Sequence, residues 1–397
     1  MLLNQNSIKK LPLFLSTQIV MLSVLLYSSA TFANTHTQLT VEELRIENAQ
    51  KKMPNVFKRL HQRYEAFNKQ ISLARNYTAL TQLIIRHGTG LWQDAVVDFS
   101  KQSKMDDRSL YWTRLQMTAA LRQSKVFKGL LPMQQEKILW NFELLSRGQK
   151  DIKFDRGASK KILVTGFDPF FLDKHIDQSN PSGIVALSFD DLTISLDGVK
   201  AEVESIILPV RFADFDQGMV ETLLIPYMKD VDMIVTISMG RTSFDLERFP
   251  ALRRSANAPD NLNVYTGATA SNPLIPSLKA QPLKGPEFIE FSLPVETMQK
   301  ATGAFKINDN RNVSTLEGKK SAQSLQELHS QISVTGSGGG YLSNEVSYRS
   351  LVLRDSYNPV LPVGHIHTPR IAAYDPDISE KITAQIKQML MLAIDKI

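Results

Sequence analysis

Apolar side chains recur at intervals of three and four residues over the first third of the chain, from about residue 40 to 148. The segments 56–64 and 110–121 show the spacing most clearly, and it is typical of helices that bury one face. Gly88 is expected to end one of these helices, since glycine readily adopts the conformation of a helix C-terminus. We therefore predict an α-helical N-terminal domain over 34–150.

The pattern changes after a polar stretch at 151–160, which we interpret as a linker. Short β-branched apolar runs follow, separated for the most part by segments of helical length. The expected strands lie at 162–165, 203–208, 233–237, 332–334 and 363–367. Alternating strands and helices predict an α/β domain over 161–397, with a mostly parallel sheet flanked by helices. In such sheets, ligands bind at the carboxyl ends of the strands.

The first 33 residues have the order of a secretory signal peptide. Lys9 and Lys10 precede an apolar run at 11–27, and small residues lead to a cleavage point after Ala33. We predict an exported protein, periplasmic or secreted. A retained membrane anchor is the alternative, although the apolar run is short for a membrane span. Once the signal is removed, no stable membrane insertion is expected.

Charge and cysteine content exclude several classes of function. The net charge of +6 over 397 residues is spread along the chain, so no nucleic-acid partner is predicted. Cysteine is absent. The chain therefore has no disulfide, no cysteine nucleophile and no cysteine metal ligand.

Residues suited to chemistry gather in four segments near the ends of the expected strands. These segments are 165–170 with 180–182, 240–248 with 259–261, 336–348, and 364–369. In the third, a short strand, a glycine-rich turn and a helix start would hold Ser343 at a strand end, and a flexible loop is the alternative. In this order and spacing the segments resemble the pyroglutamyl peptidase type I family (pyrrolidone-carboxylate peptidases), which removes N-terminal pyroglutamate from peptides. The resemblance covers roughly residues 160–397.

The resemblance implies roles for individual residues. The family's catalytic glutamate falls on Glu247 and its catalytic histidine on His367. Its nucleophile falls on Ser343, where the family has cysteine. The residues that the resemblance places around the substrate are Phe167, Phe170, Asn180, Asn257, Tyr341 and Leu342. Aromatic walls suit pyroglutamate because it is a flat, neutral lactam. No cofactor and no metal are implied, the partner is a peptide with N-terminal pyroglutamate, and oligomers are common in the family.

Three functions remain open at this point. In the first, the protein is an omega peptidase in which His367, oriented by Glu247, takes the proton of Ser343. In the second, it is a pseudoenzyme that binds pyroglutamyl or other cyclic peptide ends without cleaving them. In the third, His365 and His367 bind a metal with Glu247, because alternate residues of a strand share a face.

Departures from the family pattern favour the second function. Asn257 stands where the family has an arginine near the oxyanion, and a neutral amide stabilises negative charge less. Glu345 stands where a histidine is usual. The run at 236–239 is shorter than the family's loop, so one contact to the ring is expected to be missing. Retention of both Glu247 and His367 favours the first function.

Overall fold

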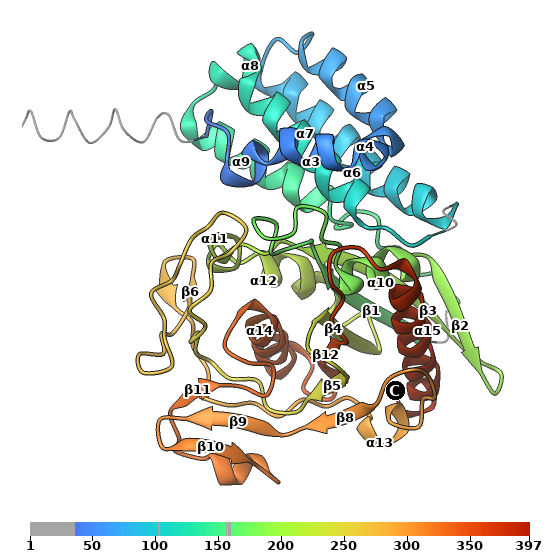
Figure 1. Cartoon of the computed structure of the whole chain (residues 1–397), viewed down its shortest axis with the longest axis vertical. Coiled ribbons are helices and arrows are strands. Elements are labelled where there is room, and N and C mark those ends of the chain that lie inside the picture. Colours follow the sequence, from blue (N-terminus) through green and yellow to red (C-terminus); the bar gives the residue numbers. More distant parts are fainter. Residues whose placement is uncertain (1–35, 102–103, 156, 158–159) are drawn as a thin grey trace, which may run out of the picture.

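The computed structural model describes residues 36–101, 104–155, 157 and 160–397, in which a helical region precedes an α/β region (Figure 1). The predicted signal peptide lies outside the described residues. Within the described ranges, no helix is both long enough and apolar enough to cross a bilayer.

Short and long helices make up the N-terminal region, which packs as one body above the sheet (Figure 1). Their bounds are α2 (Val41–Leu44), α3 (Ile46–Lys52), α4 (Pro54–Arg59), α5 (His61–Ile71), α6 (Tyr77–Ser100), α7 (Arg108–Gln123), α8 (Lys125–Lys128) and α9 (Pro132–Leu145). Helix α9 begins at a proline, whose fixed φ suits the first turn. Gly148, three residues past its end, has a φ of +96°.

The expectation that Gly88 ends a helix is wrong. Helix α6 runs through Gly88 and on to Ser100. A Cβ at residue 88 would lie 2.8 Å from Cβ of Leu145 in α9. The glycine therefore serves a close approach between two helices, and this use of glycine has the same sequence signature as a helix end.

The α/β region is built on a seven-stranded sheet in the order β2-β3-β1-β4-β12-β5-β8. The strands are β1 (Lys160–Phe167), β2 (Leu192–Leu196), β3 (Val199–Leu208), β4 (Met233–Met239), β5 (Phe244–Glu247), β8 (Ile307–Asn310) and β12 (Val363–Thr368). Neighbouring strands are parallel except at β2–β3 and β5–β12, which are antiparallel. The predicted α/β class, with a mostly parallel sheet, is confirmed.

Two small antiparallel sheets flank the main one. They contain β6 (Ser277–Leu278), β7 (Gln281–Pro282), β9 (Asn312–Thr315), β10 (Gly318–Ser321) and β11 (Ser333–Thr335). The strand expected at 332–334 is therefore present as β11, but it pairs with β9 and not with the main sheet. The glycine-rich turn that follows β11 therefore leads from this small sheet into α14 (Figure 1).

Helices cover both faces of the sheet. Their bounds are α10 (Pro181–Phe189), α11 (Phe212–Asp216), α12 (Met219–Leu224), α13 (Val295–Met298), α14 (Leu342–Tyr357) and α15 (Pro376–Ala393), with 3₁₀ turns η1 (Ile225–Tyr227), η2 (Leu325–Leu328) and η3 (Ile394–Lys396). Helices α10 and α15 contact each other and the β1–β3–β2 side, whereas α12 and α14 contact each other and α14 lies on β4 and β12.

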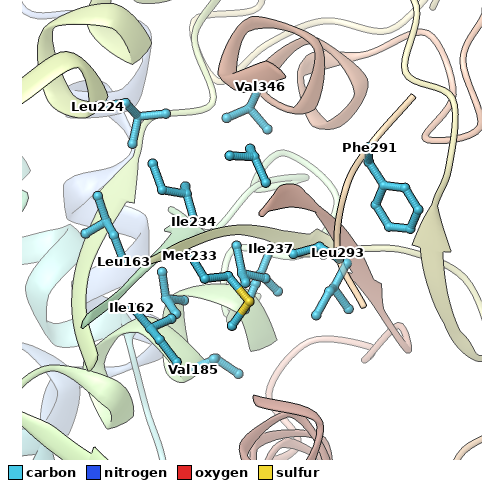
Figure 2. Packing of buried hydrophobic residues seen from close by; sticks show 14 of the residues in the cluster. Ile162, Leu163, Val185, Leu224, Met233, Ile234, Ile237, Phe291, Leu293 and Val346 are labelled. Atoms are coloured by element: carbon cyan, nitrogen blue, oxygen red, sulfur yellow. The ribbon is translucent and has the colours of Figure 1, made fainter. Parts of the chain in front are cut away.

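Fully buried aliphatic side chains fill the space between sheet and helices, as Figure 2 shows. Ile162 and Ile234 come from neighbouring central strands and point to opposite faces of the sheet. Val346 of α14 lies on the side of Ile234, and Val185 of α10 lies on the side of Ile162. Strands buried on both faces read as continuous apolar runs, which is why β1 and β4 were visible in the sequence.

The helical region shares a core with the α/β region. Leu91 and Trp92 of α6 and Phe142 of α9 belong to the same buried cluster as Ile184 of α10 and Ile207 of β3. The two regions therefore meet through apolar packing.

Candidate active site

His367 and Glu247 are joined at the end of β12. His367 Nδ1 lies 2.6 Å from Glu247 Oε1, and both side chains are largely buried. Strands β5 and β12 run side by side in opposite directions, with His367 opposite Asp245. Because a carboxylate only accepts hydrogen bonds, Nδ1 carries the proton and Nε2 keeps a free lone pair. Among the described residues, Nε2 has no hydrogen-bond partner.

His365, two residues earlier on the same strand, is held by hydroxyl groups. Its Nδ1 lies 2.8 Å from Thr236 Oγ1, and its Nε2 lies 2.8 Å from Ser238 Oγ. Burial lowers the pKa of His365 well below its usual range, and His367 lowers it further. Both ring nitrogens are engaged, and in the described part of the chain no three His, Cys, Asp or Glu side chains gather as metal ligands. The structure gives no support to the metal site considered from the sequence.

Ser343 is the second residue of α14 and follows the glycine-rich turn. Gly336 and Gly339 exchange two backbone hydrogen bonds of 3.0 Å, and Gly339 has a φ of +90°. The Ser343 hydroxyl donates to Gly338 O at 3.2 Å. A Cβ at residue 338 would lie 3.6 Å from His367 Cε1, so the glycine that binds the Ser343 hydroxyl lies next to His367. Within the described residues, Ser343 and His367 form no direct hydrogen bond.

A cavity of about 160 Å³ opens beside Ser343. Pockets for drug-sized ligands measure roughly 300–1,000 Å³, so this one suits a small group. Its lining is mostly apolar, with a few polar side chains. The lining residues are Phe167, Phe170, Phe171, Asn180, Val210, Ser238, Met239, Gly240, Tyr341, Leu342, Ser343 and Arg370.

The structure brings most of the predicted substrate residues to this cavity. Phe167, Phe170, Asn180, Tyr341 and Leu342 all line it. The Tyr341 hydroxyl donates to Pro259 O at 2.9 Å, and its ring meets Phe212 edge-on. Burial raises the pKa of Tyr341, with a further contribution from Asp260.

Asn257 lies apart from the cavity. Its side chain is exposed and it does not belong to the lining. Glu345, the residue found in place of a histidine, is buried in the first turn of α14, where Arg254 and Arg349 bind it at 2.6 and 2.8 Å. Burial alone would raise the pKa of Glu345, but the two arginines lower it below its usual range. Glu345 thus stabilises the base of α14.

Buried ion pairs from the helical region hold the loop that carries the aromatic walls. Asp168 follows Phe167 and receives Arg114 of α7 at 2.9 Å and Arg147, which follows α9, at 2.7 Å. All three side chains are at most 3% exposed. Two cations on one carboxylate fix the position of residue 168 and of Phe167 before it.

A second set of contacts holds the loop around Asn180. Asp107, just before α7, accepts from the Asn180 backbone N–H at 3.1 Å, and Arg108 donates to Asp177 O at 2.9 Å. The Asn180 amide in turn donates to Asp168 O at 2.9 Å. The helical region therefore positions two walls of the cavity.

Several residues at the site were not foreseen from the sequence. Phe171 and Arg370 directly follow foreseen motifs, and that adjacency was the available signal. Val210 follows strand β3 and Met239 is the last residue of β4, whereas Gly240 begins the segment 240–248 that the sequence analysis had singled out. Asn310, which binds Glu247, came from a segment that shows no resemblance to the peptidase family, so no signal marked it.

The fold and site define a class of protein: an α/β structure with a histidine–carboxylate pair and a small aromatic cavity at strand ends, under a helical region. Comparison with known families gives a more specific assignment. Residues 27–143 match the PA0049 N-terminal domain, and residues 161–286 and 298–372 match the PA0049 C-terminal domain. The chain belongs to the PA0049 family.

Relatives at the sequence level fall into two groups. The uncharacterized protein PA0049 of Pseudomonas aeruginosa is 29% identical over 411 aligned residues, spanning 78% of this chain and 74% of that protein. Pyrrolidone-carboxylate peptidases are more distant relatives. The one from Streptococcus pyogenes is 26% identical over 212 residues, covering 53% of this chain and 77% of its own length.

Solved structures of pyrrolidone carboxyl peptidases also align with the chain. A mutant form from Pyrococcus furiosus has 21% identity and a TM-score of 0.42, covering 59% of this chain and 99% of that one. Pyroglutamyl peptidase I from Bacillus amyloliquefaciens has 20% identity and a TM-score of 0.41, covering 60% and 98%.

Proposed function

We propose that this protein is an exported hydrolase that removes N-terminal pyroglutamate from peptides through Ser343, His367 and Glu247. The observation that carries the proposal is the buried 2.6 Å bond between His367 and Glu247, which lies against the same Gly338 that holds Ser343. The small aromatic cavity and the distant pyrrolidone-carboxylate peptidase relatives support the proposed substrate class.

The proposed reaction follows from the roles that these groups have. Ser343 leaves Gly338 O, gives its proton to His367 Nε2 and forms a bond to the pyroglutamyl carbonyl carbon. Glu247 keeps the imidazole in the Nδ1–H form and stabilises the imidazolium. His367 then protonates the leaving amine, whose bond to the carbonyl carbon breaks. A water molecule, deprotonated by His367, hydrolyses the acyl-serine and restores the hydroxyl.

Backbone groups at the start of α14 supply hydrogen-bond donors for the oxyanion. The first N–H groups of a helix have no partner within it. In the described chain, the N–H groups of Leu342 and Ser343 make no backbone bond outside the helix either. They lie beside the nucleophile at a helix N-terminus, which favours negative charge.

A second function has its own support. The Ser343 hydroxyl is bonded to Gly338 O, and Asn257 does not line the cavity. A site in this state binds a pyroglutamyl or other cyclic peptide end without cleaving it. Hydrogen bonds between catalytic groups often form only when the substrate is present. The lack of a Ser343–His367 bond therefore does not decide between the two functions, and a measurement of activity does.

The test uses a chromogenic pyroglutamyl amide with the mature chain, residues 34–397. We expect hydrolysis by the wild type and a loss of at least about a thousandfold in kcat for Ser343→Ala. Ser356→Ala is the matched control, because Ser356 lies on the exposed side of the same helix and donates to Val352 O. Its activity is expected to equal that of the wild type.

Inactivity of the wild type, with activity appearing only in Ser343→Cys, would support the binding function instead. Equal activity of wild type and Ser343→Ala would exclude the serine mechanism. Export is tested separately by fractionating cells that make the full chain or a chain lacking residues 1–33. The proposal predicts that only the full chain leaves the cytoplasm.

A further inference from the structure

Strand β8 places an asparagine directly beside the carboxylate that orients His367. In the parallel pairing of β5 and β8, Asn310 lies opposite Glu247. The Asn310 Nδ2 group donates to Glu247 Oε2 at 2.8 Å and to Ser337 O at 3.0 Å. One amide therefore links the acid of the proposed triad to the glycine-rich turn before Ser343.

The orientation of this amide is fixed by its neighbours. Glu247 Oε2 and Ser337 O can only accept hydrogen bonds, so the NH₂ side must face them. On the other side, Asn310 Oδ1 accepts from the backbone N–H and the side-chain amide of Asn312, at 3.2 and 3.0 Å. Both amide hydrogens and the oxygen form hydrogen bonds. A flipped amide would place its oxygen against two acceptor oxygens and its NH₂ group against two N–H donors.

We propose that Asn310 is a positioning residue for the His367–Glu247 pair, an inference about how the site of the proposed function is built. Glu247 is 1% exposed, and a carboxylate so deeply buried requires donors on both oxygens. His367 supplies one and Asn310 the other. Because the amide is neutral, it satisfies Oε2 without competing with His367 for the negative charge, as a lysine or arginine would.

The bond to Ser337 O gives Asn310 a second role in geometry. Ser337 is itself anchored to Phe249, whose N–H donates to Ser337 Oγ at 3.0 Å. The next carbonyl, that of Gly338, receives the Ser343 hydroxyl. Asn310 thus sets the distance between the strand that carries Glu247 and the turn that carries Ser343.

The same strand contains a matched control. Asn308, two residues earlier, lies opposite Asp245 and donates to Asp245 Oδ1 at 2.8 Å. In the described part of the chain, the Asp245 side chain forms no hydrogen bond with the His367 ring. The two asparagines therefore share a residue type, a strand and an asparagine–carboxylate hydrogen bond, and differ in whether that carboxylate holds the histidine.

The experiment measures the imidazole tautomer of His367 by ¹⁵N-NMR in the intact mature chain. The chain has seven histidines, and the signals of His367 are those that vanish in His367→Gln. We expect the wild type to populate the Nδ1–H form alone. In Asn310→Ala, and more strongly in Asn310→Asp, a second tautomer is expected, whereas Asn308→Ala leaves the spectrum of His367 unchanged.

Activity gives a second readout. If the chain hydrolyses pyroglutamyl amides, Asn310→Ala lowers kcat by about ten- to a hundredfold with little change in KM. The reason is that the His367 imidazole and the Ser343 hydroxyl would be misplaced while the cavity stays intact. An unchanged tautomer population in Asn310→Ala, or an equal change in Asn308→Ala, would overturn the inference. A tautomer change in a chain that hydrolyses nothing would uphold the inference and refute the proposed function.

Discussion

Two histidines on one strand show how the surroundings of a side chain decide its chemistry. His365 and His367 lie 4.8 Å apart with perpendicular rings. Two hydroxyl groups engage both ring nitrogens of the first, and burial lowers its pKa well below the usual range. A carboxylate holds the second, with one nitrogen left open. Only His367 has the arrangement of a general base, although both have the same side chain and share a strand face.

Arg370 brings a positive charge to the cavity. Its exposed guanidinium lies 5.4 Å from the centre of the Phe171 ring, and it forms no ion pair with the described residues. A peptide whose ring enters the cavity places its second residue near the rim. We expect Arg370→Gln to weaken binding of a pyroglutamyl-glutamate peptide by about two- to fivefold, since exposed charge pairs contribute at most about 1 kcal/mol.

Calorimetry with a Ser343→Ala background measures this effect without turnover. The pyroglutamyl-glutamine peptide, which lacks the charge, should bind Arg370→Gln and its parent equally. Arg75→Gln, at an exposed arginine of the helical region, is the matched control. An equal loss for both peptides would mean that Arg370 acts through the shape of the cavity and not through its charge.

At this scale the sequence was most informative where a motif is contiguous. Ser343, His367 and Glu247 were predicted from the sequence. The structure places His367 and Glu247 in contact, and it places Ser343 just after the glycine-rich turn next to His367. Their catalytic roles stay a prediction. Asn310 could not be foreseen, because its importance comes from the register between β5 and β8, and register is a property of paired strands.

Among the elements, the loop after β1 depends on helices that precede it by many residues. Arg114 and Arg147 are buried with Asp168, and removal of one member of a buried ion cluster leaves charge without compensation. We expect Asp168→Asn to lower the free energy of unfolding by about 3 kcal/mol or more, and to reduce affinity for pyroglutamyl ligands because Phe167 loses its support.

Urea denaturation measures this loss. Glu47→Gln provides the comparison, because Glu47 and Lys51 form an exposed pair at 2.6 Å. Its effect on the free energy of unfolding is expected to be much smaller than that of Asp168→Asn, because water screens an exposed pair. A similarly small effect of Asp168→Asn would show that the ion cluster does not hold the loop.

Strands β1, β3, β4 and β12 could be predicted from their apolar runs, because they bury both faces. Strands β2, β5 and β8 of the main sheet were not predicted. The strand that pairs with β11 could not be predicted, since a run of three residues carries no information on which sheet it joins. Gly88 shows a further limit. A helix end and a close helix contact both require a residue without a side chain, and only the position of α9 distinguishes the two.

For the whole molecule, a buried acidic pair links stability to pH. Asp190 accepts from Trp92 Nε1 at 3.0 Å at the contact between the two regions. Burial raises the pKa of Asp190 to about 7. Burial, with a contribution from Asp190, raises the pKa of Glu204 to about 9. Oxygen Oε2 of Glu204 has no partner among the described residues.

A carboxyl group with a raised pKa stabilises the fold fully below its unfolded pKa, near 4.5, and the contribution is lost as the pH rises through the folded value. Wild-type thermal stability is therefore expected to fall between about pH 5 and pH 9. In Glu204→Gln the upper part of this fall should disappear. Melting followed by circular dichroism at several pH values tests it, and parallel curves for both proteins would contradict it.

The ion cluster at Asp168 also has a consequence for the order in which the chain folds. Arg114 of α7 and Arg147, just after α9, are synthesised before their carboxylate partner on the loop after β1. Until residue 168 is available, Arg114 and Arg147 cannot enter the interior without a large desolvation cost. The helical region therefore completes its packing only once the first strand of the sheet has been made, and helices and sheet are expected to unfold in one cooperative transition.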